Sequence, residues 1–191
     1  MYSTYIAEVF KELNNEIEVI KKEIEVYFNM NYGEEVKLDY NIIEDRNHEG
    51  FAYVDKDNTV VFNFGFINDG YRNLFNRVLD INPNDDKVLK NVIRILLNCI
   101  LVHESHHFYY KKYRHEEYIR MKEKDNKQTL IKYKDLEVLA DNFMVNFMGE
   151  KGDLHFMIAG LSEKFNQGKK DRYTKDERIN DIVEEVKKYI N

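Results

Sequence analysis

The segment Leu89–His107 has the sequence LKNVIRILLNCILVHESHH and decides the fold around it. Its apolar residues recur every three or four positions, the spacing that lines one face of a helix. The residues that share this stripe are Leu89, Val92, Ile93, Leu96, Ile100, His103 and His107. Upstream, Pro83 and a run of Asn and Asp are typical of a helix start, so we expect a helix over about residues 86–112. The stripe therefore ends in two histidines on the same side of this helix.

These histidines belong to the sequence His103–His107, which is an H-E-x-x-H motif. In a helix, positions i and i+4 project from one side, so His103 and His107 can bind one metal ion, with Glu104 beside them on the next ridge. With 6 His and 20 Glu in 191 residues, chance predicts only about 0.02 such motifs. The motif in this helix therefore indicates a zinc site.

A catalytic zinc needs three protein ligands and one open position, so a further ligand has to come from elsewhere in the chain. The metzincin continuation requires Gly at position 110 and His at position 113, and this chain has Tyr110 and Tyr113. On a second predicted helix, Glu137 and Asp141 lie one turn apart. We expect Glu137 to be the third ligand. Asp141 is expected to accept a hydrogen bond from the non-coordinating nitrogen of a zinc histidine.

The H-E-x-x-H motif followed by E-x-x-A-D from Glu137 to Asp141 resembles the gluzincin class of zinc metallopeptidases. Within that class the chain resembles the compact intracellular peptidases of the ImmA/IrrE type and the phage-exclusion Lit type. The segment Tyr173–Ile179 is similar to the T-H-P-x-x-x-R-I stretch of several such peptidases, with Thr174, Arg178 and Ile179 in place and His-Pro missing.

The resemblance implies a mostly helical α+β, zincin-like fold, with a small sheet of about three strands, an active-site helix and a C-terminal helical part. It also implies limited cleavage of a specific protein partner, in phage defence or mobile-element regulation.

The chemistry assigns each site residue a role. His103, His107 and Glu137 hold one Zn²⁺, and Glu104 acts as general base for hydrolysis of a peptide bond. The oxyanion also needs a donor, and the candidates are Tyr110, Tyr133, His155 and Tyr173, among which we favour His155. The remaining histidines, His48, His106 and His115, are not expected to be metal ligands.

Around this pair of helices the sequence predicts one domain over residues 1–191. A first helix is expected over about residues 4–30, followed by a strand around 36–42 and a hairpin of Phe51–Val54 with Thr59–Phe64. Either hairpin strand could hold an extended substrate by β-addition, as the resemblance implies. Further helices are expected near residues 70–80, 114–124, 133–149, 153–166 and 175–190.

Composition restricts the partners and the compartment. A net charge of −6 disfavours general nucleic-acid binding, although Lys111–Lys134 carries a local charge of +5. A single cysteine, Cys99, excludes an intrachain disulfide and fits a reducing, cytoplasmic setting, and we expect this thiol to be buried. No segment has the composition of a signal peptide or a membrane span, so we predict no membrane association. The sequence leaves the oligomeric state open.

Other functions remain open at this point. A zincin-like module without catalytic activity would use the metal only to organise a binding surface. A helical interaction protein would use these histidines and carboxylates without any metal. Zinc-dependent hydrolysis of a substrate other than a peptide would use the same ligands. Glu104 argues against the first alternative, because a purely structural site needs no base beside the metal.

Overall fold

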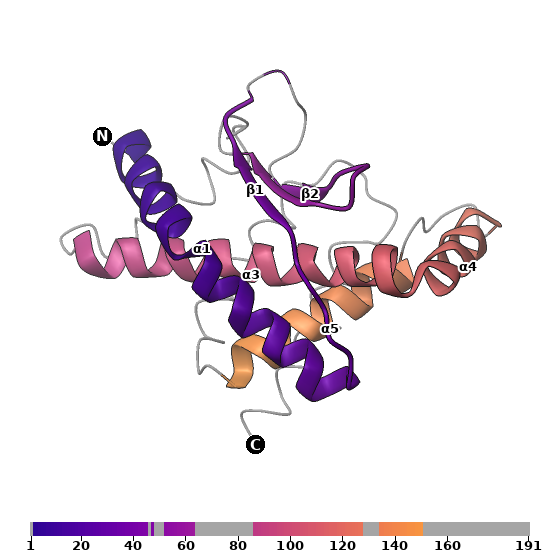
Figure 1. The fold of residues 1–191 in the computed structure, drawn as a ribbon. Helices are drawn as coiled ribbons and strands as arrows, with labels where there is room; N and C mark the ends of the chain where they lie inside the picture. Colours follow the sequence, from indigo (N-terminus) through magenta and orange to yellow (C-terminus); the bar gives the residue numbers. More distant parts are fainter. Residues whose placement is uncertain (1, 46, 48–51, 64–85, 128–133, 151–191) are drawn as a thin grey trace.

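The computed structural model describes residues 2–45, 47, 52–63, 86–127 and 134–150, which form helices and a small sheet that lies against the helix Asp86–Tyr113 (Figure 1). The helices are α1 (Tyr2–Tyr32), α3 (Asp86–Tyr113), α4 (His115–Lys127) and α5 (Lys134–Glu150). The strands are β1 (Tyr40–Ile43), β2 (Ala52–Val54) and β3 (Val60–Asn63). The prediction of a mostly helical α+β fold is confirmed for these residues. The helices expected at 70–80, 153–166 and 175–190 lie outside them, and the single-domain boundary stays a prediction.

Helix α1 ends where its sequence favours termination. Gly33 has a positive φ of 68°, and its amide donates to the carbonyl of Asn29 at 2.9 Å. A residue in the left-handed region closes a helix in this way, and glycine adopts it without the steric cost of a Cβ atom. The chain then reverses direction towards the sheet.

The sheet has the strand order β1-β3-β2, with β1 parallel and β2 antiparallel to β3. The hairpin of β2 and β3 was expected from the sequence and is confirmed. Its turn is held by Asp55, whose Oδ1 accepts the amides of Asp57 and Thr59 at 2.9 Å each. Asn58 takes the left-handed conformation, with φ 58°, which asparagine tolerates better than most residues.

The strand predicted around residues 36–42 is only partly correct, because pairing begins at Tyr40. Val36 and Leu38 are buried as their alternation predicted. However, the amide of Lys37 donates to the Tyr113 hydroxyl and that of Leu38 to the Glu25 carboxylate, each at 2.8 Å. Since side chains take these hydrogen bonds, this segment needs no neighbouring strand.

The strand order also corrects one expectation about peptide binding. The described part of Thr59–Phe64, strand β3, is paired on both sides, by β1 and by β2. It therefore cannot add a further strand, and Thr59–Phe64 was wrong as a candidate substrate strand. Strand β2 is at an edge of the sheet, and within the described ranges its pairing is with β3 alone.

The core lies where α1, α5 and the sheet contact α3 (Figure 1). Its largest fully buried side chains come from α1, β3 and α3: Ile24 and Phe28 of α1, Phe62 of β3, and Leu101, Phe108 and Tyr109 of α3. Cys99 is also buried in this core, as expected. Among the described helices none combines the length and the hydropathy that a membrane span requires.

Candidate metal centre

Two imidazoles of α3 face each other at the end of its apolar stripe. The Nε2 atoms of His103 and His107 lie 3.0 Å apart, and the two rings meet edge to face with centroids at 4.7 Å. The spacing of four residues puts both rings on one side of the helix, as the motif predicted. The two ring nitrogens thereby lie next to each other on one side of α3.

Helix α5 brings a carboxylate to these nitrogens. Glu137 Oε2 lies 3.4 Å from His103 Nε2, and Glu137 Oε1 lies 3.3 Å from His107 Nε2. Of the described residues, these three form the one group of His, Cys, Asp or Glu that could hold a metal ion. The two helices meet because Leu136, Ala140 and Phe143 are buried on the same side of α5.

The three donors are close enough together to share one metal ion. Ligand atoms at about 2.0–2.2 Å from a tetrahedral zinc are about 3.3–3.6 Å apart. The imidazole nitrogens are 3.0 Å apart, and each is within 3.4 Å of a different oxygen of Glu137. Taken as one ligand atom per residue, the three donors lie within 4.8 Å of one another. Two neutral imidazoles and one carboxylate are also a donor set that zinc prefers at catalytic sites.

Asp141 supports the first histidine from behind. Its Oδ1 lies 2.9 Å from His103 Nδ1, and the two side chains are only 4% and 5% exposed. His103 Nδ1–H is thus the donor to this carboxylate, which leaves the Nε2 lone pair directed at His107 and Glu137. The structure places Asp141 where the sequence predicted a partner for a zinc histidine.

The pKa values reflect this concentration of charge. Burial lowers the pKa of His103, but its hydrogen bonds to Asp141 and Glu137 and their negative charges outweigh burial and raise the pKa to about 9. Burial raises the pKa of Glu137, but the positive charges of His107 and His103 outweigh it and hold this pKa well below its usual range. Without a metal, the two carboxylates therefore favour the protonated form of His103.

Glu104 lies on the next ridge of α3, about 100° around the helix from His103. Its side chain is half-buried, and no described residue forms a hydrogen bond or an ion pair with its carboxylate. The donor set is accessible, because the side chains of His107 and Glu137 are 17% and 30% exposed.

His106 lies within the motif, between the two candidate ligands, but has a different environment. Its ring is buried against Tyr110 and Phe143, with centroids at 5.0 and 4.9 Å, and its Nε2 lies 3.3 Å from the Tyr32 hydroxyl. Burial lowers its pKa well below the usual value, and the charges of His107 and His103 lower it further. His106 is therefore a neutral core residue, and the sequence alone did not indicate its bond to Tyr32.

Of the remaining histidines and predicted oxyanion donors, the structure describes Tyr110 and His115. Tyr110 is half-buried and packs on His106 rather than between the ligands. His115 is exposed, and its Nδ1 lies 3.1 Å from the carbonyl of Lys111. His155, Tyr133, Tyr173 and His48 lie outside the described residues, as do Thr174, Arg178 and Ile179. The site that the structure brings together thus consists of His103, Glu104, His107, Glu137 and Asp141.

Comparison of the chain with protein-family models, with curated proteins and with solved structures gives no match. The interpretation of this site therefore depends on its own geometry and on the order of its residues in the chain.

Proposed function

We propose that this chain is a zinc-dependent metallopeptidase with a zincin-like arrangement of its helices and sheet. The observation that carries the proposal is the convergence of His103, His107 and Glu137 from two helices, with one ligand atom of each residue within 4.8 Å of the others. A structural metal site would need no base, whereas here Glu104 lies on the next ridge with no partner among the described residues.

The ligands and the base have separate tasks in this proposal. His103, His107 and Glu137 would hold the zinc ion, which would supply a Lewis acid and make water acidic enough, with a pKa of about 7, to act as a nucleophile. Glu104 accepts the proton of the attacking water and returns it to the amine that leaves. Asp141 holds His103 in the tautomer whose Nε2 is free to bind.

The proposed substrate is an extended peptide segment that adds to strand β2. This edge strand contacts α3, and the ammonium of Lys111 donates to the carbonyl of Asp55 directly after β2. Lys111 lies one helical turn beyond His107, near the ridge that carries the metal ligands. The edge strand is thus tied to α3 close to the donor set, where β-addition would present a peptide bond.

The finer parts of the proposal come from the resemblance to the ImmA/IrrE-type and Lit-type peptidases. They are cleavage of one specific protein partner, a role in phage defence or mobile-element regulation, and action in the cytoplasm. A single buried cysteine is consistent with that reducing compartment.

The first test is metal content. Tag-free wild-type protein and the variant Glu137→Ala are reconstituted with zinc, desalted and measured by inductively coupled plasma mass spectrometry. We expect one zinc per chain in the wild type and loss of zinc in the variant. No zinc in the wild-type protein would refute the metallopeptidase and favour a helical interaction protein without metal.

Hydrolysis is tested separately, by incubating the protein with a proteome digest of long peptides and sequencing new N-termini by mass spectrometry. Sites cut by wild-type protein and left intact by Glu104→Gln support a peptidase. Zinc binding combined with no cleavage of peptides or of intact protein extract would favour a binding module or hydrolysis of another substrate class.

A further inference from the structure

We propose that His106 is a positioning residue for the metal centre, and that its hydrogen bond to Tyr32 keeps the two ligand-bearing helices in register. This inference rests on the proposed function, because it concerns the same zinc site. His106 itself is directed away from the donor set: its Nε2 contacts the Tyr32 hydroxyl at 3.3 Å, on helix α1.

The ring of His106 lies at the contact between the two ligand helices. It is three residues from His103 on α3, and its ring packs on Phe143 of α5 with a centroid distance of 4.9 Å. Phe143 in turn comes two residues after Asp141, which holds His103. A rotation of the His106 ring would therefore displace Phe143, and with it the part of α5 that carries Asp141 and Glu137.

One hydrogen bond determines the orientation of this ring. His106 is 1% exposed, and its Nδ1 is buried without a hydrogen-bond partner in the described part of the chain. The Nε2–H donor to Tyr32 is the consistent tautomer, because a buried acceptor without a partner costs less than a buried N–H without one. Loss of the Tyr32 hydroxyl would thus leave the ring held by packing alone.

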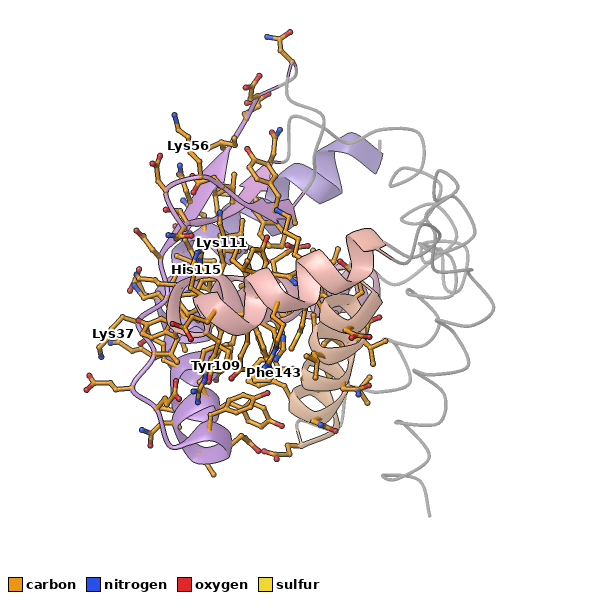
Figure 2. All side chains as sticks on the ribbon, turned by 90° about the vertical axis from the view of Figure 1, so that its right-hand side faces the viewer. Lys37, Lys56, Tyr109, Lys111, His115 and Phe143 are labelled. Atoms are coloured by element: carbon orange, nitrogen blue, oxygen red, sulfur yellow. The ribbon has the colours of Figure 1, made fainter. Side chains whose placement is uncertain are left out.

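Helix α1 is able to act as the fixed reference in this arrangement. Phe28 stacks on Phe143 at 4.4 Å and on Tyr109 at 4.9 Å, and Tyr32 stacks on Tyr109 at 5.1 Å. Figure 2 labels Tyr109 and Phe143, the members of this cluster that come from α3 and α5. These contacts join α1 to both ligand helices, so the Tyr32 hydroxyl has a defined position from which to hold His106.

The test compares zinc affinity with fold stability in matched variants. Tyr32→Phe and His106→Phe each remove the hydrogen bond and keep an aromatic ring. Tyr109→Phe is the control. It removes a hydroxyl from the same aromatic cluster, with its hydrogen bonds to Glu34 and Arg114, but leaves the bond between Tyr32 and His106 in place. Zinc affinity is measured by competition with a chromophoric chelator. The ligand geometry is followed by the visible absorption bands of the cobalt-substituted protein, and the stability by thermal unfolding in chelator.

We expect Tyr32→Phe and His106→Phe each to weaken zinc binding about three- to tenfold, the range that corresponds to one hydrogen bond. The cobalt bands should shift in both, and the double variant should bind no more weakly than either single variant, because both remove the same interaction. His106→Gln, which can still donate to Tyr32, should restore part of the affinity. Tyr109→Phe should lower thermal stability without changing zinc affinity.

Three results would overturn the inference. If Tyr32→Phe bound zinc within twofold of the wild-type affinity, the hydrogen bond between Tyr32 and His106 would have no role in positioning the metal ligands. An equal loss of affinity in Tyr109→Phe would show that any loosening of the cluster has the same effect. Wild-type protein that binds no zinc would refute the proposed function and this inference together.

Discussion

Asp141 Oδ1 lies 2.9 Å from His103 Nδ1, and both side chains are almost completely buried. Their positions in the chain are 38 residues apart, on helices α3 and α5. A buried carboxylate beside an imidazole stabilises the N–H at that nitrogen and keeps the opposite nitrogen free for a metal. This contact therefore links the packing of the two helices to the chemistry of the donor set.

Asp141→Asn should weaken zinc binding about 10–100-fold, the usual range for a residue that supports a metal ligand. The amide can still accept a hydrogen bond from His103, but it has no negative charge to make the imidazole more basic. Chelator competition on the folded variant measures the change. The exposed Glu150→Gln on the same helix is the control and should bind zinc like wild type, and equal affinity in Asp141→Asn would remove this role.

Glu137→Ala and His107→Ala should each weaken zinc binding at least about tenfold, because each removes one of three ligands. Both side chains are partly exposed, so we expect the variants to fold, as circular dichroism would show. If Glu137→Ala retained one zinc per chain at wild-type affinity, Glu137 would not be a ligand.

Glu104→Gln should retain zinc and lose hydrolysis by about 10²–10⁴-fold, the typical contribution of a general base. Glutamine has nearly the same size but cannot accept a proton. The rate is measured on a peptide that the wild-type protein cleaves, with exposed Glu116→Gln as control. Full activity of Glu104→Gln would assign the proton transfer to another group.

Zinc affinity should increase with pH up to about 9. In the metal-free protein the pKa of His103 is raised to about 9, so at pH 7 zinc has to displace a proton from this histidine. Each pH unit below 9 should then lower the affinity about tenfold for this one proton. Chelator competition between pH 6 and 9 measures the slope, and affinity that is independent of pH would contradict the protonated state of His103.

The metal-free protein should become less stable as pH rises from about 6.5 to about 9. Since the folded-state pKa of His103 lies above its ordinary value of 6.5, protonation favours the folded state. The contribution of His103 protonation to the free energy of unfolding is complete below pH 6.5 and is lost as the pH rises through about 9. The decline is at most about 1.4 kcal/mol per pH unit, the slope for one proton. Urea unfolding in chelator would reveal it, and Asp141→Asn should reduce the slope.

Local patterns in the sequence predicted much of this structure. The helices expected at about residues 4–30, 86–112, 114–124 and 133–149 lie within a few residues of α1, α3, α4 and α5. The pairs His103 with His107 and Glu137 with Asp141 were predicted to share helix faces, because a spacing of four residues is determined by the helical backbone alone. The hairpin followed from alternation on both sides of a turn with Asp and Asn.

Contacts between elements required the tertiary structure. Residues 36–38 do not pair with a strand because side chains distant in sequence, Glu25 and Tyr113, form hydrogen bonds with the backbone of Lys37 and Leu38. Strand β3 became the central strand through its parallel pairing with β1, which no local pattern encodes.

The distances of 3.3 and 3.4 Å from Glu137 to the two histidines likewise depend on how α5 packs on α3. The hydrogen bond between Tyr32 and His106 depends in the same way on how α1 packs on α3. Local sequence patterns were enough to predict which side chains share a helix face. Packing of the buried faces decided which faces meet, because that energy depends on the whole core at once.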